Sequence, residues 1–134
     1  MANIIYNVYK EQALLGNVDL DNDTLKVALV TSSYVPNPTD TSFSNEVSDG
    51  SGYTTGGKVL GNTSVTKDNV NDKAILDGDD VTWSSATITS NAAIIYKDDT
   101  TDVLIAYIDF GGDKGSVLGD FTIQWNTNGI IQLS

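Results

Sequence analysis

Three short runs of acidic residues are the first candidates for chemistry, because closely spaced carboxylate oxygens are the ligands that calcium prefers. The first run has the spacing that opens a calcium-binding loop, but Thr24 and Val30 stand where that loop needs Gly and Glu. Aspartate is also favoured in turns, where its carboxylate accepts backbone hydrogen bonds. We therefore assign no metal and no cofactor, and an irregular calcium site stays the alternative. The runs are Asp19, Asp21 and Asp23; Asp77, Asp79 and Asp80; and Asp98, Asp99 and Asp102.

A glycine-rich segment, Gly52–Lys58, matches the first seven positions of the phosphate-binding loop G-x-x-x-x-G-K. The next residue is Val59, where the loop needs a Ser or Thr hydroxyl for magnesium. The context also differs, because a polar loop precedes the segment and a strand-like pattern follows it. We interpret Gly52–Lys58 as a glycine-rich turn.

The side-chain inventory excludes much chemistry. The chain has no His, no Cys and no Arg, and its 18 acidic residues against 7 lysines give a net charge of −11. No nucleophile–base arrangement of the Ser-His-Asp or Cys-His kind can form, so we predict that the protein is not an enzyme. The negative charge repels nucleic acid and anionic membrane surfaces, so we expect neither as a partner.

The hydrophobic pattern predicts one domain over residues 1–134 that is mainly β. Apolar residues at three- to four-residue spacing over residues 4–15 indicate a short helix, with Asn3 as its N-cap and Gly16 just past its end. Turn signals then recur at the spacing typical of an antiparallel β-sandwich, of which a jelly roll is one arrangement. Strands are expected within residues 25–29, 54–60, 64–69, 74–76, 81–83, 92–96, 103–108, 121–125 and 130–133.

Two turns give the expected pairing of neighbouring strands. Asp77–Asp80 predicts a hairpin between the strands on either side of it. Asn126–Gly129 predicts a second turn, after which Ile130–Leu133 is the return strand. Both tryptophans, Trp83 and Trp125, lie in alternating strands and are expected in the core, although sugar stacking on them is an alternative.

The segment Val103–Ile108 is apolar at every position, so both faces of this strand must be covered. Either the N-terminal helix or a neighbouring subunit is expected to cover the second face. The polar stretch Thr31–Ser51 predicts a long loop, and loops of this length often contact a partner.

Several segments carry a resemblance that runs along nearly the whole chain. The resemblance is to a family of small virion structural proteins of tailed bacteriophages, most closely to capsid decoration, or cement, proteins. It rests on strands and turns and transfers no catalytic residue. The segments are Met1–Asn7, Asp23–Thr31, Glu46–Val47, Ser51–Gly57, Asp80–Trp83, Ala93–Lys97, Leu104–Gly111 and Gly119–Trp125.

The resemblance implies a non-enzymatic protein of the virion, made in the host cytoplasm, that binds the outer surface of the major capsid shell as a homotrimer and stabilises it. An acidic surface agrees with this role, since it keeps free subunits soluble and complements a basic patch on a shell protein. We expect the partner contacts in the N-terminal segment and in the Thr31–Ser51 loop. The residues are Ile4, Ile5, Tyr6, Tyr9, Tyr34, Val35 and Phe43.

Two other functions stay open at this point. A tail or head–tail connector protein is the alternative within the same resemblance. A carbohydrate-binding β-sandwich module, with or without calcium, is the alternative outside it.

Overall fold

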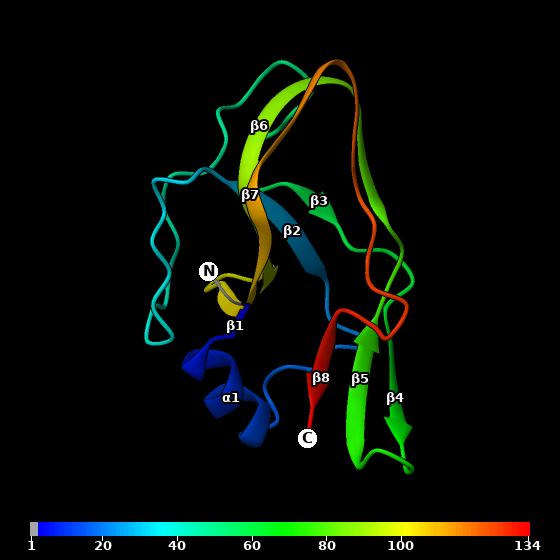
Figure 1. Cartoon of the computed structure of the whole chain (residues 1–134). Coiled ribbons are helices and arrows are strands. Elements are labelled where there is room, and N and C mark those ends of the chain that lie inside the picture. Colours follow the sequence, from blue (N-terminus) through cyan, green and yellow to red (C-terminus); the bar gives the residue numbers. More distant parts are fainter. Residues whose placement is uncertain (1–2) are drawn as a thin grey trace.

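The computed structural model describes residues 3–134 and consists of two antiparallel sheets and one short helix (Figure 1). The five-stranded sheet has the order β1-β7-β6-β2-β3, and the three-stranded sheet has the order β4-β5-β8. The β-sandwich class and the N-terminal helix expected from the sequence are confirmed. The elements are β1 (Ile4–Ile5), α1 (Asn7–Leu14), β2 (Leu25–Val30), β3 (Lys58–Val59), β4 (Ser64–Asp68), β5 (Lys73–Asp77), β6 (Val81–Lys97), β7 (Val103–Ile123) and β8 (Ile131–Leu133).

One long hairpin of β6 and β7 dominates the fold. Its strands have 17 and 21 residues and pair from Lys97 opposite Val103 at the turn to Val81 opposite Ile123 at the far end. The sequence predicted four separate short strands here, because serines and glycines interrupt the apolar pattern. The structure instead forms one long pair of strands with several register shifts, of which the largest leaves residues 110–113 of β7 opposite the single β6 residue Asn91.

The hairpin also links the two layers. Figure 1 shows β6 and β7 arching over the top of the molecule, from the region beside β2 to the region above β4, β5 and β8. Trp83 and Phe121, on the far half of the hairpin, join the same core cluster as Leu76 of β5 and Ile131 of β8. One pair of strands therefore contributes to the packing of both sheets.

The five-stranded sheet is apolar on both faces, as Val103–Ile108 predicted. Leu25, Val27 and Leu29 of β2 belong to the core between the sheets, whereas Ala28 and Val30 belong to a second cluster on the opposite face. We call these clusters the inter-sheet core and the outer cluster.

A bulge in β7 changes the expected assignment of side chains to these faces. Strict alternation along the strand would place Ile105 and Tyr107 on one face of the sheet and Leu104 and Ala106 on the other. In the structure Ile105 and Ala106 both join the inter-sheet core, and Leu104 and Tyr107 both join the outer cluster. The cause is a register shift, since Ile95 pairs with Ala106 while Tyr96 pairs with Leu104.

The chain itself covers the outer cluster, which answers the question of what lies on the second face. Tyr6 and Val8 at the start of α1 pack there together with Tyr34 and Phe43 from the loop after β2. Figure 1 shows this loop on the side of the five-stranded sheet opposite β4, β5 and β8. The helix and the loop thus share the covering role that the sequence assigned to a helix or a neighbouring subunit.

The helix is shorter than the sequence predicted. Ile4 and Ile5 form β1 and pair with Tyr107 and Ala106, and Tyr6 is the residue before the helix. Asn3 is therefore not the N-cap. Gly16 follows the helix with a φ of 76°, as expected for the residue just past a helix end.

Two pairings expected from turns are wrong. Strands β5 and β6 do not form a hairpin around Asp77–Asp80, because β5 pairs with β4 and β8. Strand β8 likewise pairs with β5, through Ile131 opposite Leu76, and not with the strand that precedes its turn. Each of these two segments carries the chain from one sheet into the other, since Asp77–Asp80 joins β5 to β6 and Asn126–Gly129 joins β7 to β8.

Candidate functional site

Most of the residues expected to contact a partner lie inside the protein. Tyr6, Tyr9 and Tyr34 are 0%, 4% and 6% exposed, and Phe43 packs on Tyr96 with ring centroids 5.7 Å apart. Only Val35, which is 72% exposed, presents a large apolar surface. Ile4 and Ile5 are half-buried in β1. Contact through the buried tyrosines requires the loop and the helix to leave the sheet, and such contact stays a prediction.

Hydrogen bonds between tyrosines and carboxylates hold that loop in place. Tyr34 shares a 2.9 Å hydrogen bond with the Tyr6 hydroxyl and donates to Asp40 Oδ2 at 2.8 Å. Burial raises the pKa of Tyr6 to about 12. Burial, followed by the hydrogen bonds with Tyr6 and Asp40, also raises the pKa of Tyr34. These phenols are therefore protonated over the ordinary pH range and act as structural donors.

A second hydrogen bond between a tyrosine and a carboxylate holds the end of the loop that follows β2. The Tyr53 hydroxyl donates to Glu46 Oε2 at 2.5 Å and accepts the Leu29 N–H at 3.0 Å. The same carboxylate oxygen accepts the Gly56 N–H, which belongs to the segment that resembles a phosphate loop. The segment continues into the short strand β3 and not into a helix, in agreement with its interpretation as a turn.

Carboxylates of the acidic runs accept backbone hydrogen bonds in turns and form ion pairs with lysines. Asp19 accepts the backbone N–H groups of Asp21 and Asn22, and Asp23 pairs with Lys97 at 3.4 Å. Within residues 3–134, no three acidic side chains gather in a way that could hold a metal ion. No helix in the same range is long and apolar enough to cross a bilayer.

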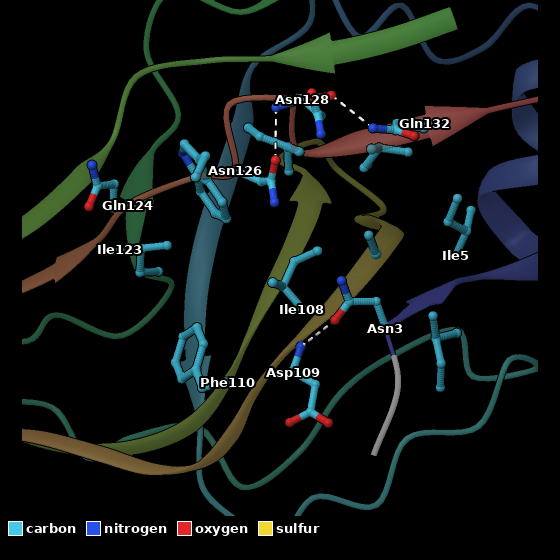
Figure 2. Close-up of a pocket in the computed structure, with 16 residues that line it drawn as sticks. Asn3, Ile5, Ile108, Asp109, Phe110, Ile123, Gln124, Asn126, Asn128 and Gln132 are labelled. Carbon is cyan, nitrogen blue, oxygen red and sulfur yellow. Dashed lines mark hydrogen bonds between the residues drawn. The ribbon is translucent and has the colours of Figure 1, made fainter. Parts of the chain in front are cut away.

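A groove lies beside the outer edge of the five-stranded sheet, and we call it the edge groove (Figure 2). It has a volume of about 550 Å³ and lies between the outer edge of β1 and β7 and the C-terminal segment that contains β8. Its apolar wall consists of partly buried residues that extend the inter-sheet core to the surface. These residues are Ile5, Ile108, Phe110 and Ile130.

The polar rim of the edge groove consists of side-chain amides. Asp109 is the one charged residue among those that line it, although the chain as a whole carries a charge of −11. Trp125 is also part of the lining but is only 9% exposed, and its indole N–H donates to Asp79 O at 2.7 Å. The amides are those of Asn3, Gln124, Asn126, Asn128 and Gln132.

A second hollow of about 530 Å³ continues the groove along the far half of β7. The two hollows share Phe110, Ile123 and Gln124. The same half of β7 carries an exposed apolar pair, Val117 and Leu118, which are 81% and 83% exposed.

A bulge produces this exposed pair. Ala86 pairs with Gly119 and Ile88 with Ser116, so Val117 and Leu118 together lie opposite one residue of β6, Thr87. Leu118 has a φ of 48°, a left-handed conformation that a branched side chain rarely adopts, and its N–H donates to Thr87 Oγ1 at 3.1 Å. Strained residues of this kind concentrate at functional sites.

The edge groove is a partly apolar hollow with one charged lining residue on a strongly acidic protein, and the Val117–Leu118 bulge is an exposed apolar pair on β7. Each of these features suits binding of a protein or another uncharged ligand. No sequence signal points to them directly, because Asn126–Gly129 and the glycines after Phe110 indicate only turns. The core positions of Trp83 and Trp125, in contrast, are confirmed.

Comparison with known proteins adds no relative. No family model, no curated protein and no solved structure matches the chain.

Proposed function

We propose that this chain is a non-enzymatic structural protein of a tailed bacteriophage particle that binds the outer surface of the capsid shell as a trimer and stabilises it. The sequence resemblance provides the class of particle. The structural observation that supports the proposal is the exposed apolar pair Val117 and Leu118, on a chain that is rich in carboxylates.

The physical argument concerns the area available for contact. Exposed apolar side chains such as Val117 and Leu118 give favourable burial when a partner covers them. The acidic surface repels nucleic acid and disfavours non-specific association, which favours a partner with complementary charge. Three copies in a trimer engage the shell together, so that modest contacts add through effective concentration.

Cryo-electron microscopy of the purified particle that contains this chain tests the proposal. We expect density for the chain in trimers on the outer face of the shell. Density at the tail or the portal would favour the connector alternative. Absence of the chain from the particle would overturn the proposal.

A matched pair of variants tests which surface makes the contact. Replacing both Val117 and Leu118 with Asp should remove the chain from the particle without unfolding it, since both side chains are exposed. Val70→Asp is the control, because Val70 is 90% exposed but lies in the turn between β4 and β5. Equal occupancy of the two variants on particles would exclude the bulge as the contact.

The amide-rich rim favours one second candidate, a carbohydrate-binding module. Asn and Gln side chains provide both donors and acceptors for sugar hydroxyls. A rise in melting temperature with millimolar neutral oligosaccharides, and no association with particles, would favour this candidate.

A further inference from the structure

The bulge of β7 presents two apolar side chains, Val117 and Leu118, to the surroundings, and we call this pair the knob. The two residues are 81% and 83% exposed, and within residues 3–134 neither belongs to a hydrophobic cluster. Leu118 also has a φ of 48°, which costs free energy in a residue with a branched side chain. An exposed apolar pair held in a strained conformation indicates a contact surface.

The second hollow, of about 530 Å³, has an apolar floor that suits such side chains. Phe110, Phe121 and Ile123 line it, and the ring centroids of the two phenylalanines lie 6.3 Å apart. Phe110 is only partly buried at the margin of the inter-sheet core. Aliphatic side chains that enter the hollow would cover this ring further, which is favourable because apolar surface leaves water.

The far half of the β6–β7 hairpin, residues 81–91 and 114–123, differs in charge from the rest of the chain. It contains only two charged residues, Lys114 and Asp120, and so has no net charge, whereas the whole chain carries −11. Copies of a strongly acidic chain repel one another. This repulsion is smallest where the far halves of two hairpins approach each other.

Lys114 and Asp120 also give the far half complementary charges on either side of the knob. Both residues are exposed and line the second hollow, and within residues 3–134 neither forms an ion pair. When the knob of one copy meets the hollow of another, the lysine of one copy can face the aspartate of the other. One surface therefore provides the knob, its receptor and the matching charges, which favours a second copy over an unrelated protein.

We propose that copies of this chain join head to tail through the far half of the hairpin, with the knob of each copy in the second hollow of the next and Lys114 of one copy beside Asp120 of its neighbour. Contacts of this kind close into a ring when the rotation between copies divides a full turn. The inference rests on the proposed function for the number of copies in the ring, which is three.

This arrangement makes a neighbouring copy the partner that covers Val117 and Leu118. Replacing both residues with Asp then removes the chain from particles because the trimer dissociates. A single copy lacks the combined contacts with the shell that three joined copies make.

Directed disulfide formation tests the contact, because the chain has no cysteine of its own. Leu118→Cys places a thiol on the knob, and Gln124→Cys places one at the exposed rim of the hollow. After oxidation with copper phenanthroline, the double variant should give covalent trimers as its largest species on a denaturing gel. A mixture of the two single variants should give covalent dimers, and each single variant alone should stay monomeric.

The matched control combines Val70→Cys with Gln124→Cys. Val70 is 90% exposed but lies in the turn between β4 and β5, so this double variant should give no covalent trimers. Circular dichroism equal to that of the unaltered chain shows that each variant is folded.

Reversal of the two charges tests the electrostatic part of the contact. The unaltered chain should sediment as a trimer in analytical ultracentrifugation. Lys114→Asp or Asp120→Lys alone should weaken association about fivefold per contact, because like charges then meet between copies. The double reversal restores opposite charges at every contact and should restore the trimer.

Three results would overturn the inference: an unaltered chain that sediments as a monomer up to about 1 mM, no cross-link between the knob and hollow thiols, or equal cross-linking of the Val70→Cys control. Covalent dimers as the largest species of the Leu118→Cys, Gln124→Cys double variant would also overturn it, since a two-fold pair would replace the ring. If the contact fails while the chain is present on the shell, the ring fails and binding to the shell stands. If the ring forms but the chain is absent from particles, the inference stands and the proposed function fails.

Discussion

Two stretches of β7 differ in what the rest of the chain packs against them. Leu104 and Tyr107 lie under Tyr6 and Tyr34, which the N-terminal segment and the loop after β2 provide. From Ile108 to Phe110 the same strand borders the edge groove, and within residues 3–134 no strand pairs with its outer edge after Tyr107. We call these the covered stretch and the groove stretch.

The polar groups of the two stretches differ in the same way. The phenols over the covered stretch are buried, and Tyr34 bonds with both Tyr6 and Asp40 inside the protein. Beside the groove stretch, the side-chain hydrogen bonds of Asn3 and Asn126 involve only their amide oxygens. We therefore expect the stability of the fold to depend more on the covered stretch than on the groove stretch.

High pH should produce the largest effect, because it acts on every tyrosine of the covered stretch at once. Burial raises the pKa of Tyr6 and of Tyr96 to about 12. A phenol whose pKa is higher in the folded than in the unfolded chain stabilises the fold below pH 10. That contribution is lost as the pH rises from about 10 through 12.

We therefore expect cooperative unfolding in this alkaline range. The measurement is the absorbance of ionised tyrosine at rising pH, followed together with circular dichroism. The two signals should change in one transition. Tyrosine ionisation with an ordinary pKa near 10 in a chain that keeps its circular dichroism would contradict the burial of all six phenols.

Tyr6→Ala should have the next largest effect. The Tyr6 side chain is fully buried in the outer cluster and hydrogen-bonded to Tyr34, so its loss leaves a cavity and removes one of the two hydrogen bonds of the Tyr34 hydroxyl. We expect a loss of about 3–5 kcal/mol in the free energy of unfolding, measured by urea denaturation. Leu14→Ala, at a position 91% exposed at the end of α1, is the control and should change this free energy by less than about 0.5 kcal/mol.

Tyr53→Phe tests the contribution of a single buried hydroxyl group, because it removes one oxygen and leaves the packing of the ring unchanged. The Leu29 N–H and the Glu46 carboxylate both lose a partner. We expect a loss of about 1–3 kcal/mol in the free energy of unfolding. Hydrogen exchange should locate the change at Leu29 and Gly56. A variant as stable as the unaltered chain would show that Tyr53 contributes only through its ring.

Asn126→Ala beside the groove stretch should have the smallest effect. It removes one hydrogen bond within an exposed turn, so the free energy of unfolding should fall by less than about 1 kcal/mol. Thermal denaturation is sufficient to measure the change. A loss as large as that of Tyr6→Ala would mean that the amide belongs to the structural core, and the contrast between the two stretches would then fail.

The covered stretch was largely predictable from the sequence. An uninterrupted apolar strand such as Val103–Ile108 requires cover on both faces, and the sequence correctly identified the N-terminal helix as one source of that cover. The bulge at Ile105 was not predictable, since nothing in an apolar run marks which residue is the extra one. The face assignment was wrong for that reason.

The groove stretch was not predictable, because its sequence signals are local and its structure is not. Gly111 and Gly112 indicate a turn, but here they belong to a bulge of residues 110–113, after which pairing of β7 with β6 resumes at Lys114. The pairing of β8 with β5 depends on packing between distant segments, which no turn residue specifies. Asn3 and Asn126 face each other across the groove only because these long-range pairings form.

The β6–β7 hairpin has a consequence for the order of folding. Lys97 and Val103 meet across a short turn, whereas Val81 and Ile123 lie at opposite ends of a long segment of the chain. Closing a short loop costs less entropy than closing a long one, so pairing is expected to begin at the turn and to advance toward the far end. The β4–β5 hairpin also closes a short turn, with Asp68 opposite Lys73, so it is expected to form early, whereas the pairing of β8 with β5 joins distant segments and is expected to form late.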